Sequence, residues 1–312
     1  AYRKLVRETG FDIDFLTISS VDADSLFHPQ YFAYLTYEFL RDGNRYRKFW
    51  QSATVYYNNI WQVPVLTRIL SVFGSIWRIG VLIRHDRLIA HATYSLSFKM
   101  LKQIGFWDTD VIPEDYRIFF KAFYKLGGRI KAEPLYLKTS MDAPLSTNYW
   151  RSLKNKYEQE KRWAWGVSDD PLFIKWWLTV PNISFWEKTV HLTHVLTDHF
   201  LWPVHWFTIT LAANIVPLLN PHFARTALGY NLPKLSSFVL TTCLLALVVM
   251  LIIDWRQRPR PVNVSRARII LAPFEFILMP LSGLFLSAIP ALIAHVRLMF
   301  GKRLEYKVTE KV

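Results

Sequence analysis

The sequence predicts a soluble α/β domain followed by an α-helical membrane region. Long apolar runs are confined to the C-terminal part of the chain, from about Thr189 onward. Residues 15–21 form a short apolar, β-branched run that is typical of a buried strand, and residues 114–126 have the spacing of an amphipathic helix. Five tryptophans cluster before and at the start of the first long run, where an aromatic belt would meet the membrane surface. They are Trp176, Trp177, Trp186, Trp202 and Trp206.

Three apolar runs predict membrane-spanning helices. Residues 199–223 contain no Asp, Glu, Lys or Arg, and residues 235–253 are uncharged over about the length that crosses ~30 Å of hydrocarbon. The third run, 269–296, is interrupted by Glu275 and two prolines. A buried core helix would explain one such run but not three in succession. We expect the helices at about 199–219, 235–254 and 269–299.

The charge pattern predicts the orientation of a multi-pass membrane protein. The net charge is +14, and five arginines lie between the second and third runs. By the positive-inside rule this loop and the N-terminal domain are cytoplasmic. The tail, 301–312, is also basic, so the third run either turns back as a broken hairpin near Ser282 and Gly283 or crosses once. Because the excess charge lies beside apolar runs, anionic membrane lipids explain it better than nucleic acid.

The chain divides into four parts. These are a soluble domain at 1–168, an interfacial amphipathic segment at 169–198, membrane helices within 199–300 and the basic tail at 301–312. Residues 2–7 have the pattern of a helix end. The chain begins at Ala1 without methionine, so we expect a fragment of a longer protein. Its single cysteine, Cys243, excludes an intrachain disulfide and a cysteine metal cluster.

Asp22 and Asp24 directly follow the predicted strand. In α/β sheets, ligands bind at the carboxyl ends of strands, and paired carboxylates there suit a hard cation with a diphosphate. Asp-x-Asp is also ordinary turn chemistry, so the pair by itself is a weak signal.

Glu114 and Asp115 open the amphipathic helix, directly after Pro113. Carboxylates in a first turn commonly serve only as helix caps. Because the helix macrodipole favours their charged form, we expect a carboxylate that is ionised at neutral pH and can accept a proton from a hydroxyl.

A third motif lies just ahead of the membrane region, in a segment that reads as a helix from Tyr149. Gln159, Arg162 and Trp163 stand at i, i+3 and i+4 and therefore share one face. A guanidinium can fork onto phosphate oxygens, and an indole offers a flat surface to a sugar. An arginine–tryptophan pair at the membrane surface is the simpler alternative.

Together the three motifs resemble the D-x-D, E-D and Q-x-x-R-W signatures of membrane-bound family 2 glycosyltransferases. That group includes cellulose, chitin and hyaluronan synthases and ceramide glucosyltransferases. The resemblance covers about residues 1–166, and Q-x-x-R-W ahead of membrane helices is its most specific part. It implies a GT-A type α/β domain, with residues 1–168 as its C-terminal half. Because the ending 301–311 looks like the tails of bacterial members, the bacterial inner (plasma) membrane is the expected location.

The resemblance also implies how a nucleotide-diphosphate sugar is held. Asp22 and Asp24 would bind the diphosphate and its Mg²⁺ or Mn²⁺, with Asp24 as the more direct ligand. Gln159 and Arg162 would hold the diphosphate oxygens.

For the acceptor, Asp115 would be the general base, with Glu114 beside it, and Trp163 would stack under the acceptor sugar. The reaction would be an inverting hexosyl transfer. Pro113 stands where the family often has threonine. The base- and ribose-binding strands of the family lie ahead of D-x-D, so we expect this chain by itself to be inactive in a radiolabelled-sugar transfer assay.

The motifs leave three functions open. The enzyme either polymerises a glycan or glycosylates a lipid-linked acceptor once, and a membrane scaffold or transporter subunit is the non-enzymatic alternative. Gln51, Asn58 and Asn59 stand where the family places residues near the donor, although a polar loop is the simpler expectation. His85 and His91 either face the active site or, more simply, lie at the surface or in capping positions.

Overall fold

The computed structural model describes Glu8 and residues 10–109, 111–260, 263–305 and 309. The helix end predicted at 2–7 and half of the basic tail predicted at 301–312 lie outside these residues. The chain forms two compact units. Unit 1 comprises Ala1–Asn58, Trp77–Asp142 and Gly166–Leu196, and unit 2 comprises Asn59–Ile76, Ala143–Trp165 and Thr197–Val312.

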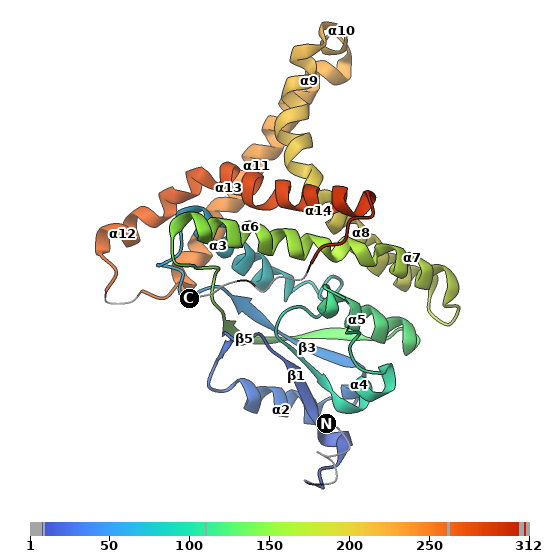
Figure 1. Cartoon of the computed structure of the whole chain (residues 1–312). Helices are drawn as coiled ribbons and strands as arrows, with labels where there is room; N and C mark the ends of the chain where they lie inside the picture. Colours follow the sequence, from blue (N-terminus) through green and yellow to red (C-terminus); the bar gives the residue numbers. More distant parts are fainter. Residues whose placement is uncertain (1–7, 9, 110, 261–262, 306–308, 310–312) are drawn as a thin grey trace. The chain divides into compact units, whose positions relative to one another are not determined.

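Unit 1 is built on a mixed five-stranded sheet with the order β1-β4-β3-β5-β2 (Figure 1). The strands are β1 (Thr17–Ser20), β2 (Leu26–Phe27), β3 (Lys48–Val55), β4 (Tyr94–Ser97) and β5 (Lys131–Ser140). β3 and β5 pair in parallel, whereas β1–β4, β4–β3 and β5–β2 are antiparallel. β1, β3 and β5 therefore run in one direction, and their carboxyl ends meet at one edge of the sheet.

Apolar residues cover both faces of the sheet. Adjacent side chains of a strand point to opposite faces, so Phe49 and Trp50 of β3 belong to different clusters. α2 (Tyr31–Arg41) packs on the Trp50 face through Tyr31, Leu35 and Phe39, at helical spacing. α4 (Phe98–Ile104) and α5 (Glu114–Lys125) contribute to the cluster on the Phe49 face (Figure 1).

The predicted helix at 114–126 is confirmed, because α5 spans Glu114–Lys125 and Gly127 and Gly128 follow it with positive φ. The predicted strand at 15–21 is only partly correct. Phe15 ends a short 3-10 helix, η1 (Ile13–Phe15), and β1 is half-buried rather than buried. The reason is its position, since β1 is an edge strand that pairs with β4 on one side only. Two further helices in the described part of unit 1 are η2 (Arg45–Arg47) and α7 (Asp170–Thr179).

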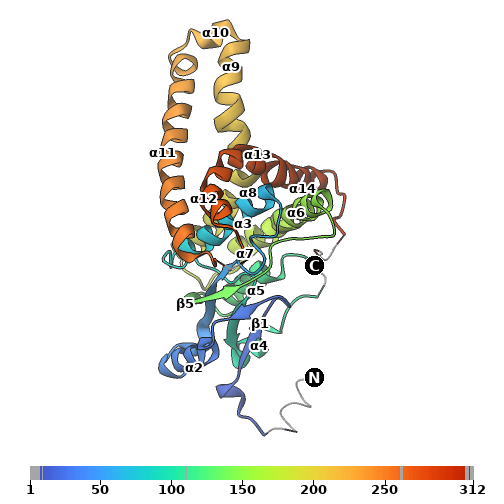
Figure 2. The same ribbon diagram turned by 90° about the vertical axis from the view of Figure 1, so that its left-hand side faces the viewer.

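Among the residues that the structure describes, three helical stretches are long and apolar enough to cross a membrane, namely Phe185–Leu219, Ala227–Gln257 and Arg266–Met299. The first comprises α8 (Phe185–Trp206), the π-helical η4 (Phe207–Ala212) and α9 (Ala213–Leu219). Pro203 lies within α8 and cannot donate a backbone hydrogen bond, and the π-helical η4 begins four residues later. Within unit 2, α10 (Pro221–Ala224) leads into α11 (Ala227–Gln257), which lies beside α9 (Figure 2).

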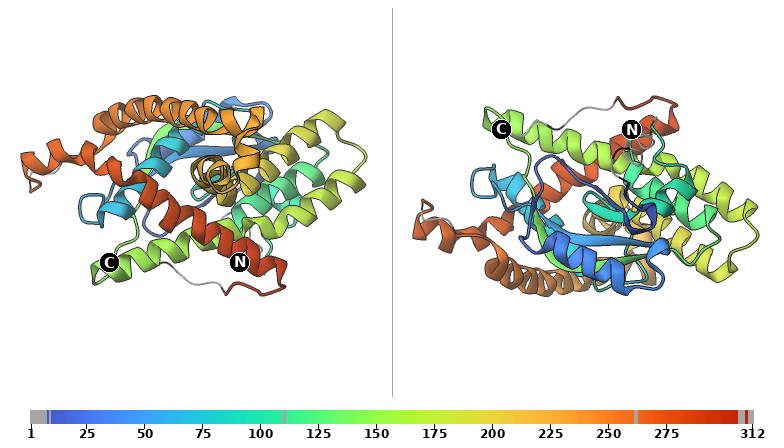
Figure 3. Two further views of the ribbon diagram at one scale, coloured as in Figure 1. Left: turned by 90° about the horizontal axis from the view of Figure 1, so that it is seen from above. Right: turned by 90° about the horizontal axis from the view of Figure 1, so that it is seen from below.

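The third stretch is a succession of short helices. These are α12 (Arg266–Leu271), η5 (Ala272–Leu278), α13 (Met279–Gly283), η6 (Leu284–Ala288) and α14 (Ile289–Met299). The backbone stays helical at Gly283 (φ −61, ψ −41), which is one of the two residues near which the sequence allows a hairpin turn. α14 lies along α6 (Tyr149–Ala164), with Ala291 and Ala294 buried (Figure 3). α3 (Val65–Val81) and η3 (Trp165–Asp169), like α8, contribute residues to both units.

Candidate active site

The Asp22-Ala23-Asp24 turn lies between β1 and β2, at the edge where β1, β3 and β5 end. The backbone N–H of Asp142, after β5, donates to Asp24 Oδ2 at 2.7 Å. The Asn58 side chain, after β3, donates to the carbonyl oxygen of Asp24 at 3.2 Å. The turn is thus held by residues that follow the two neighbouring parallel strands, as expected for a ligand-binding edge of an α/β sheet. Asp22 is exposed and Asp24 is half-buried.

Asp115 lies in the first turn of α5, where its Oδ2 accepts a hydrogen bond of 2.8 Å from the backbone N–H of Ala92. The side chain of Tyr94 also hydrogen-bonds this carboxyl group, and the charge of Asp22 acts on it. Glu114, one residue earlier, is exposed. Within unit 1 the fold therefore brings the first two predicted motifs close enough to interact electrostatically.

The expectation that Asp115 is ionised at neutral pH is wrong for this structure. Burial, followed by repulsion from Glu114 and Asp22, raises the pKa of Asp115 to about 8, although the hydrogen bonds from Ala92 and Tyr94 lower it. A helix N-terminus stabilises an exposed carboxylate by only about 0.3–1 kcal/mol. Desolvation together with two like charges outweighs that contribution here.

Tyr94 is a neighbour of Asp115 that the sequence did not reveal. It is fully buried in β4, and its hydroxyl accepts a hydrogen bond of 2.8 Å from Trp107 Nε1. Burial and the charge of Asp115 raise the pKa of Tyr94. The hydroxyl therefore stays protonated and can donate to Asp115. A single tyrosine in a strand carries no motif, so only the strand register identifies it.

Two polar residues occupy other positions than expected. Gln51 is not in a loop but within β3, fully buried. His91 is half-buried rather than at the surface, and burial lowers its pKa to about 3. His91 is therefore neutral at neutral pH and does not act as an imidazolium acid.

The third motif lies in unit 2, on α6, which Asn148 caps. Gln159 is buried, and Lys156 Nζ donates to its Oε1 at 3.1 Å. The same ammonium pairs with Glu160 at 2.7 Å and lies 4.8 Å from the ring centroid of Trp163. Lys156 therefore connects Gln159 to Trp163 on one face of the helix, and the sequence motif did not include it.

Arg162, the remaining residue of the third motif, is half-buried. Its Nη2 donates to Thr309 Oγ1 of the C-terminal tail at 3.3 Å. A guanidinium fork is the kind of group that binds phosphate oxygens. The first two motifs thus belong to unit 1 and the third to unit 2.

The candidate cation site at the sheet edge consists of the carboxylates of Asp22 and Asp24. No group of three or more His, Cys, Asp or Glu side chains that could hold a metal occurs among the residues that the structure describes. Mg²⁺ commonly binds through one or two carboxylates and completes its shell with substrate phosphates and water. The oxygen-only pair Asp22 and Asp24 fits that mode, in which the cation arrives with a diphosphate.

The described residues thus combine a mixed α/β domain with helices that are long and apolar enough to cross a membrane. A family model described as glycosyl transferase family group 2 matches residues 17–253, which is more than half of the chain. The chain therefore belongs to this family, whose members transfer glycosyl groups and generally use a divalent metal. A comparison with curated proteins gave no match.

Proposed function

We propose that the protein is an inverting hexosyltransferase that moves a sugar from a nucleotide-diphosphate donor to a hydroxyl of a glycan acceptor. The observation that carries the proposal is the carboxyl group of Asp115, which lies within electrostatic reach of Asp22 at one sheet edge. Donor chemistry requires carboxylates that can hold a cation with the diphosphate, and acceptor chemistry requires a base beside them. Unit 1 contains Asp22 and Asp24 for the first task and Asp115 for the second.

Asp115 takes the proton of the acceptor hydroxyl in this proposal. A base is most effective when its pKa lies near the operating pH, and the raised pKa of about 8 places Asp115 in that range. Glu114 contributes by repelling the charge of Asp115 rather than by touching the acceptor. Tyr94 and the Ala92 amide orient the carboxyl group.

Asp22 and Asp24 hold the donor diphosphate together with Mg²⁺ or Mn²⁺, which stabilises negative charge on the leaving group. Gln159 and Arg162 bind diphosphate oxygens, and Trp163 stacks under the acceptor sugar. Support comes from the chemistry of α6, where Lys156 orders Gln159 and Trp163.

We place the reaction at the cytoplasmic face of a bacterial inner membrane. Support comes from the arginine-rich segment between α11 and the third apolar stretch, with Arg256, Arg258, Arg260, Arg266 and Arg268. The helices of unit 2 then serve as the route of a growing glycan.

The experiment uses the full-length protein in membranes with a panel of uridine- and guanosine-diphosphate sugars and Mg²⁺ or Mn²⁺. The proposal predicts nucleotide diphosphate release and a ladder of products on sizing gels. Asp24→Asn and Asp115→Asn should each reduce turnover by at least about 100-fold. Asp86→Asn is the matched control, because Asp86 forms only an exposed ion pair with Arg84.

Two other results would change the proposed function. A single lipid-linked product would replace the glycan acceptor with a lipid acceptor. Full activity of both aspartate variants would contradict the proposal and favour a scaffold.

A further inference from the structure

The backbone that contacts Asp115 adopts an unfavourable conformation. Ala92, in the loop that precedes β4, has a φ of 51°. A residue with a Cβ atom rarely adopts this left-handed conformation, and such strain persists only where the surroundings enforce it. The strained residue is the one whose N–H donates to Asp115 Oδ2, at 2.8 Å.

A single side chain holds both neighbours of Ala92. Gln51 Oε1 accepts a hydrogen bond from the backbone N–H of His91 at 2.9 Å. Gln51 Nε2 donates to the carbonyl oxygen of Thr93 at 3.1 Å and to that of Ser52 at 3.0 Å. A carboxamide can accept and donate at the same time. Gln51 therefore bridges the residue before Ala92 and the residue after it.

The position of Gln51 makes this clamp rigid. The residue lies in β3 with no solvent exposure and pairs with Tyr94 across the β3–β4 ladder. Since alternate residues of a strand share a face, Gln51 lies on the Phe49 face, which α5 covers. The clamp is thus anchored in the sheet core, on the side from which Asp115 approaches.

We propose that Gln51 is a positioning residue for the general base: it holds the loop at 89–93 so that the Ala92 N–H is directed at Asp115. This inference rests on the proposed function, in which Asp115 deprotonates the acceptor. The hydrogen bond engages Oδ2 and orients the other carboxylate oxygen. It also stabilises the charged form of Asp115, which burial and the charges of Glu114 and Asp22 disfavour.

A purely structural role would give a different result. A buried carboxamide could serve only to satisfy backbone groups, in which case its loss would lower stability without a specific effect on the base. Ser52→Ala is the matched control, because Ser52 lies next in β3, is fully buried, and hydrogen-bonds Thr139 Oγ1 at 2.9 Å instead of the loop.

The test compares Gln51→Met, Gln51→Asn and Ser52→Ala in the full-length protein. Methionine has about the length of glutamine but removes the two hydrogen bonds to His91 and Thr93. Asparagine keeps the amide but is too short to bridge these two residues. For either Gln51 variant that folds, we expect kcat to fall about 10- to 100-fold and the donor KM to change less than about threefold. The acid limb of the kcat/KM profile should move to higher pH, because a hydrogen bond to the charged base is lost. Amides 91–93 should exchange faster with deuterium.

A second-site rescue separates positioning from folding. Glycine adopts positive φ without strain, so Ala92→Gly in the Gln51→Met background should restore part of kcat. An unchanged pH profile and kcat in both Gln51 variants, or equal losses in Ser52→Ala, would overturn the inference. If Asp115→Asn retains full activity, the proposed function fails instead, and faster exchange at 91–93 still reports whether the clamp exists.

Discussion

At Asp115, local sequence and tertiary environment act in opposite directions. The first turn of a helix favours a charged carboxylate. Burial and the neighbouring charges of Glu114 and Asp22 disfavour it, and they dominate, which raises the pKa to about 8. This environment makes the carboxyl group a base suited to weakly alkaline pH. It also means that ionisation of Asp115 lowers the stability of the folded protein.

That cost predicts a pH-dependent effect of Asp115→Asn on stability. The pKa is raised from 3.8 to about 8 on folding, so the folded state binds more protons than the unfolded state between these values. Stability therefore decreases as pH rises through this window. Asparagine cannot ionise, so the variant should be more stable than the wild type at pH 8. The melting temperature in detergent measures the difference, which should vanish near pH 4.

The same pKa predicts the pH dependence of turnover. Only the ionised form of Asp115 accepts a proton, so kcat/KM of the free enzyme should rise about tenfold per pH unit below the pKa and level off near pH 8. Initial rates at subsaturating donor from pH 5.5 to 9 measure the profile. A flat profile through pH 6–8 would argue against Asp115 as the base.

Lys156 gives a residue-scale prediction in unit 2. Lys156→Met removes the ammonium that bonds Gln159 and pairs with the buried Glu160. We expect a loss of about 3 kcal/mol, because an uncompensated buried carboxylate remains, and a donor KM raised roughly tenfold, about the loss of one charge-assisted hydrogen bond. Adding Glu160→Gln should recover stability without recovering KM. Lys154→Met, an exposed lysine of the same helix, is the control.

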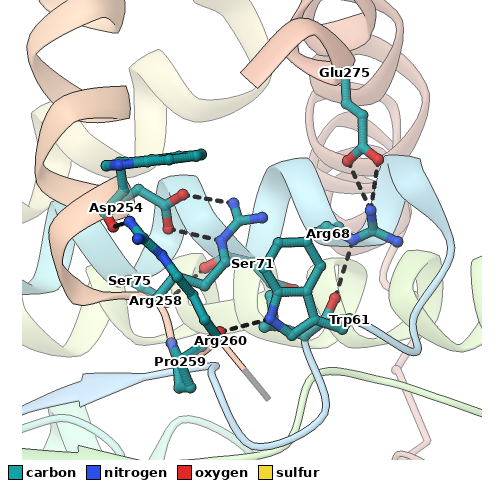
Figure 4. A network of polar contacts seen from close by, with 11 residues as sticks. Trp61, Arg68, Ser71, Ser75, Asp254, Arg258, Pro259, Arg260 and Glu275 are labelled. Atoms are coloured by element: carbon teal, nitrogen blue, oxygen red, sulfur yellow. Dashed lines mark hydrogen bonds and ion pairs between the residues drawn. The ribbon is translucent and has the colours of Figure 1, made fainter. Parts of the chain in front are cut away.

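At the scale of elements, a polar network connects α3 to η5 within unit 2 (Figure 4). Arg68 of α3 donates to both carboxylate oxygens of Glu275, at 2.6 and 2.8 Å. It also donates to the carbonyl oxygens of Ile60 and Val63, at 3.0 and 2.9 Å. The carboxylate that interrupts the third apolar run is thus satisfied by a buried arginine, as a charge in an apolar helix must be.

A second part of the network surrounds Trp61. Its indole N–H donates to the carbonyl oxygen of Pro259 at 2.7 Å, and its own carbonyl oxygen accepts from Arg268 at 2.5 Å. Arg258 lies over the ring, 4.9 Å from its centroid, and pairs with Asp254 at 2.6 Å. Arg258 and Arg268 of the basic segment therefore also hold the loop that contains Trp61.

The network predicts that Glu275→Gln destabilises the protein by about 3 kcal/mol, because it leaves the Arg68 guanidinium buried without a counter-charge. Asp86→Asn breaks the exposed Arg84–Asp86 pair and should cost less than about 1 kcal/mol. Melting temperatures in detergent compare the two variants. Equal shifts would show that the buried pair is not a source of stability.

For the whole molecule, the three apolar stretches and the basic segment predict the membrane topology. Cys243 is the single cysteine, so Cys243→Ser provides a background for labelling. In it, Arg260→Cys should react with a membrane-impermeant maleimide only in inverted vesicles. Asn220→Cys, between α9 and α10, should react only in intact cells. The reverse pattern would place the basic segment outside.

Much of the fold, and the elements that carry the candidate site residues, could be predicted from the sequence because their signals are local. The apolar runs, the amphipathic α5, the helix from Tyr149 and the D-x-D turn each depend on residues close together in the chain. The Q-x-x-R-W pattern was recognisable for the same reason, whereas the family is shown by the match over residues 17–253.

The ionisation of Asp115, the clamp of Gln51 on the Ala92 loop and the pairing of Arg68 with Glu275 could be decided only by the tertiary structure. Each joins residues far apart in the chain, through strand pairing or helix packing that no local pattern specifies. The sequence by itself determined which chemical groups the protein has and in which elements they lie. Packing decided their burial and their neighbours, and a carboxyl group's charge depends on both because low-dielectric surroundings penalise an ion that water would stabilise.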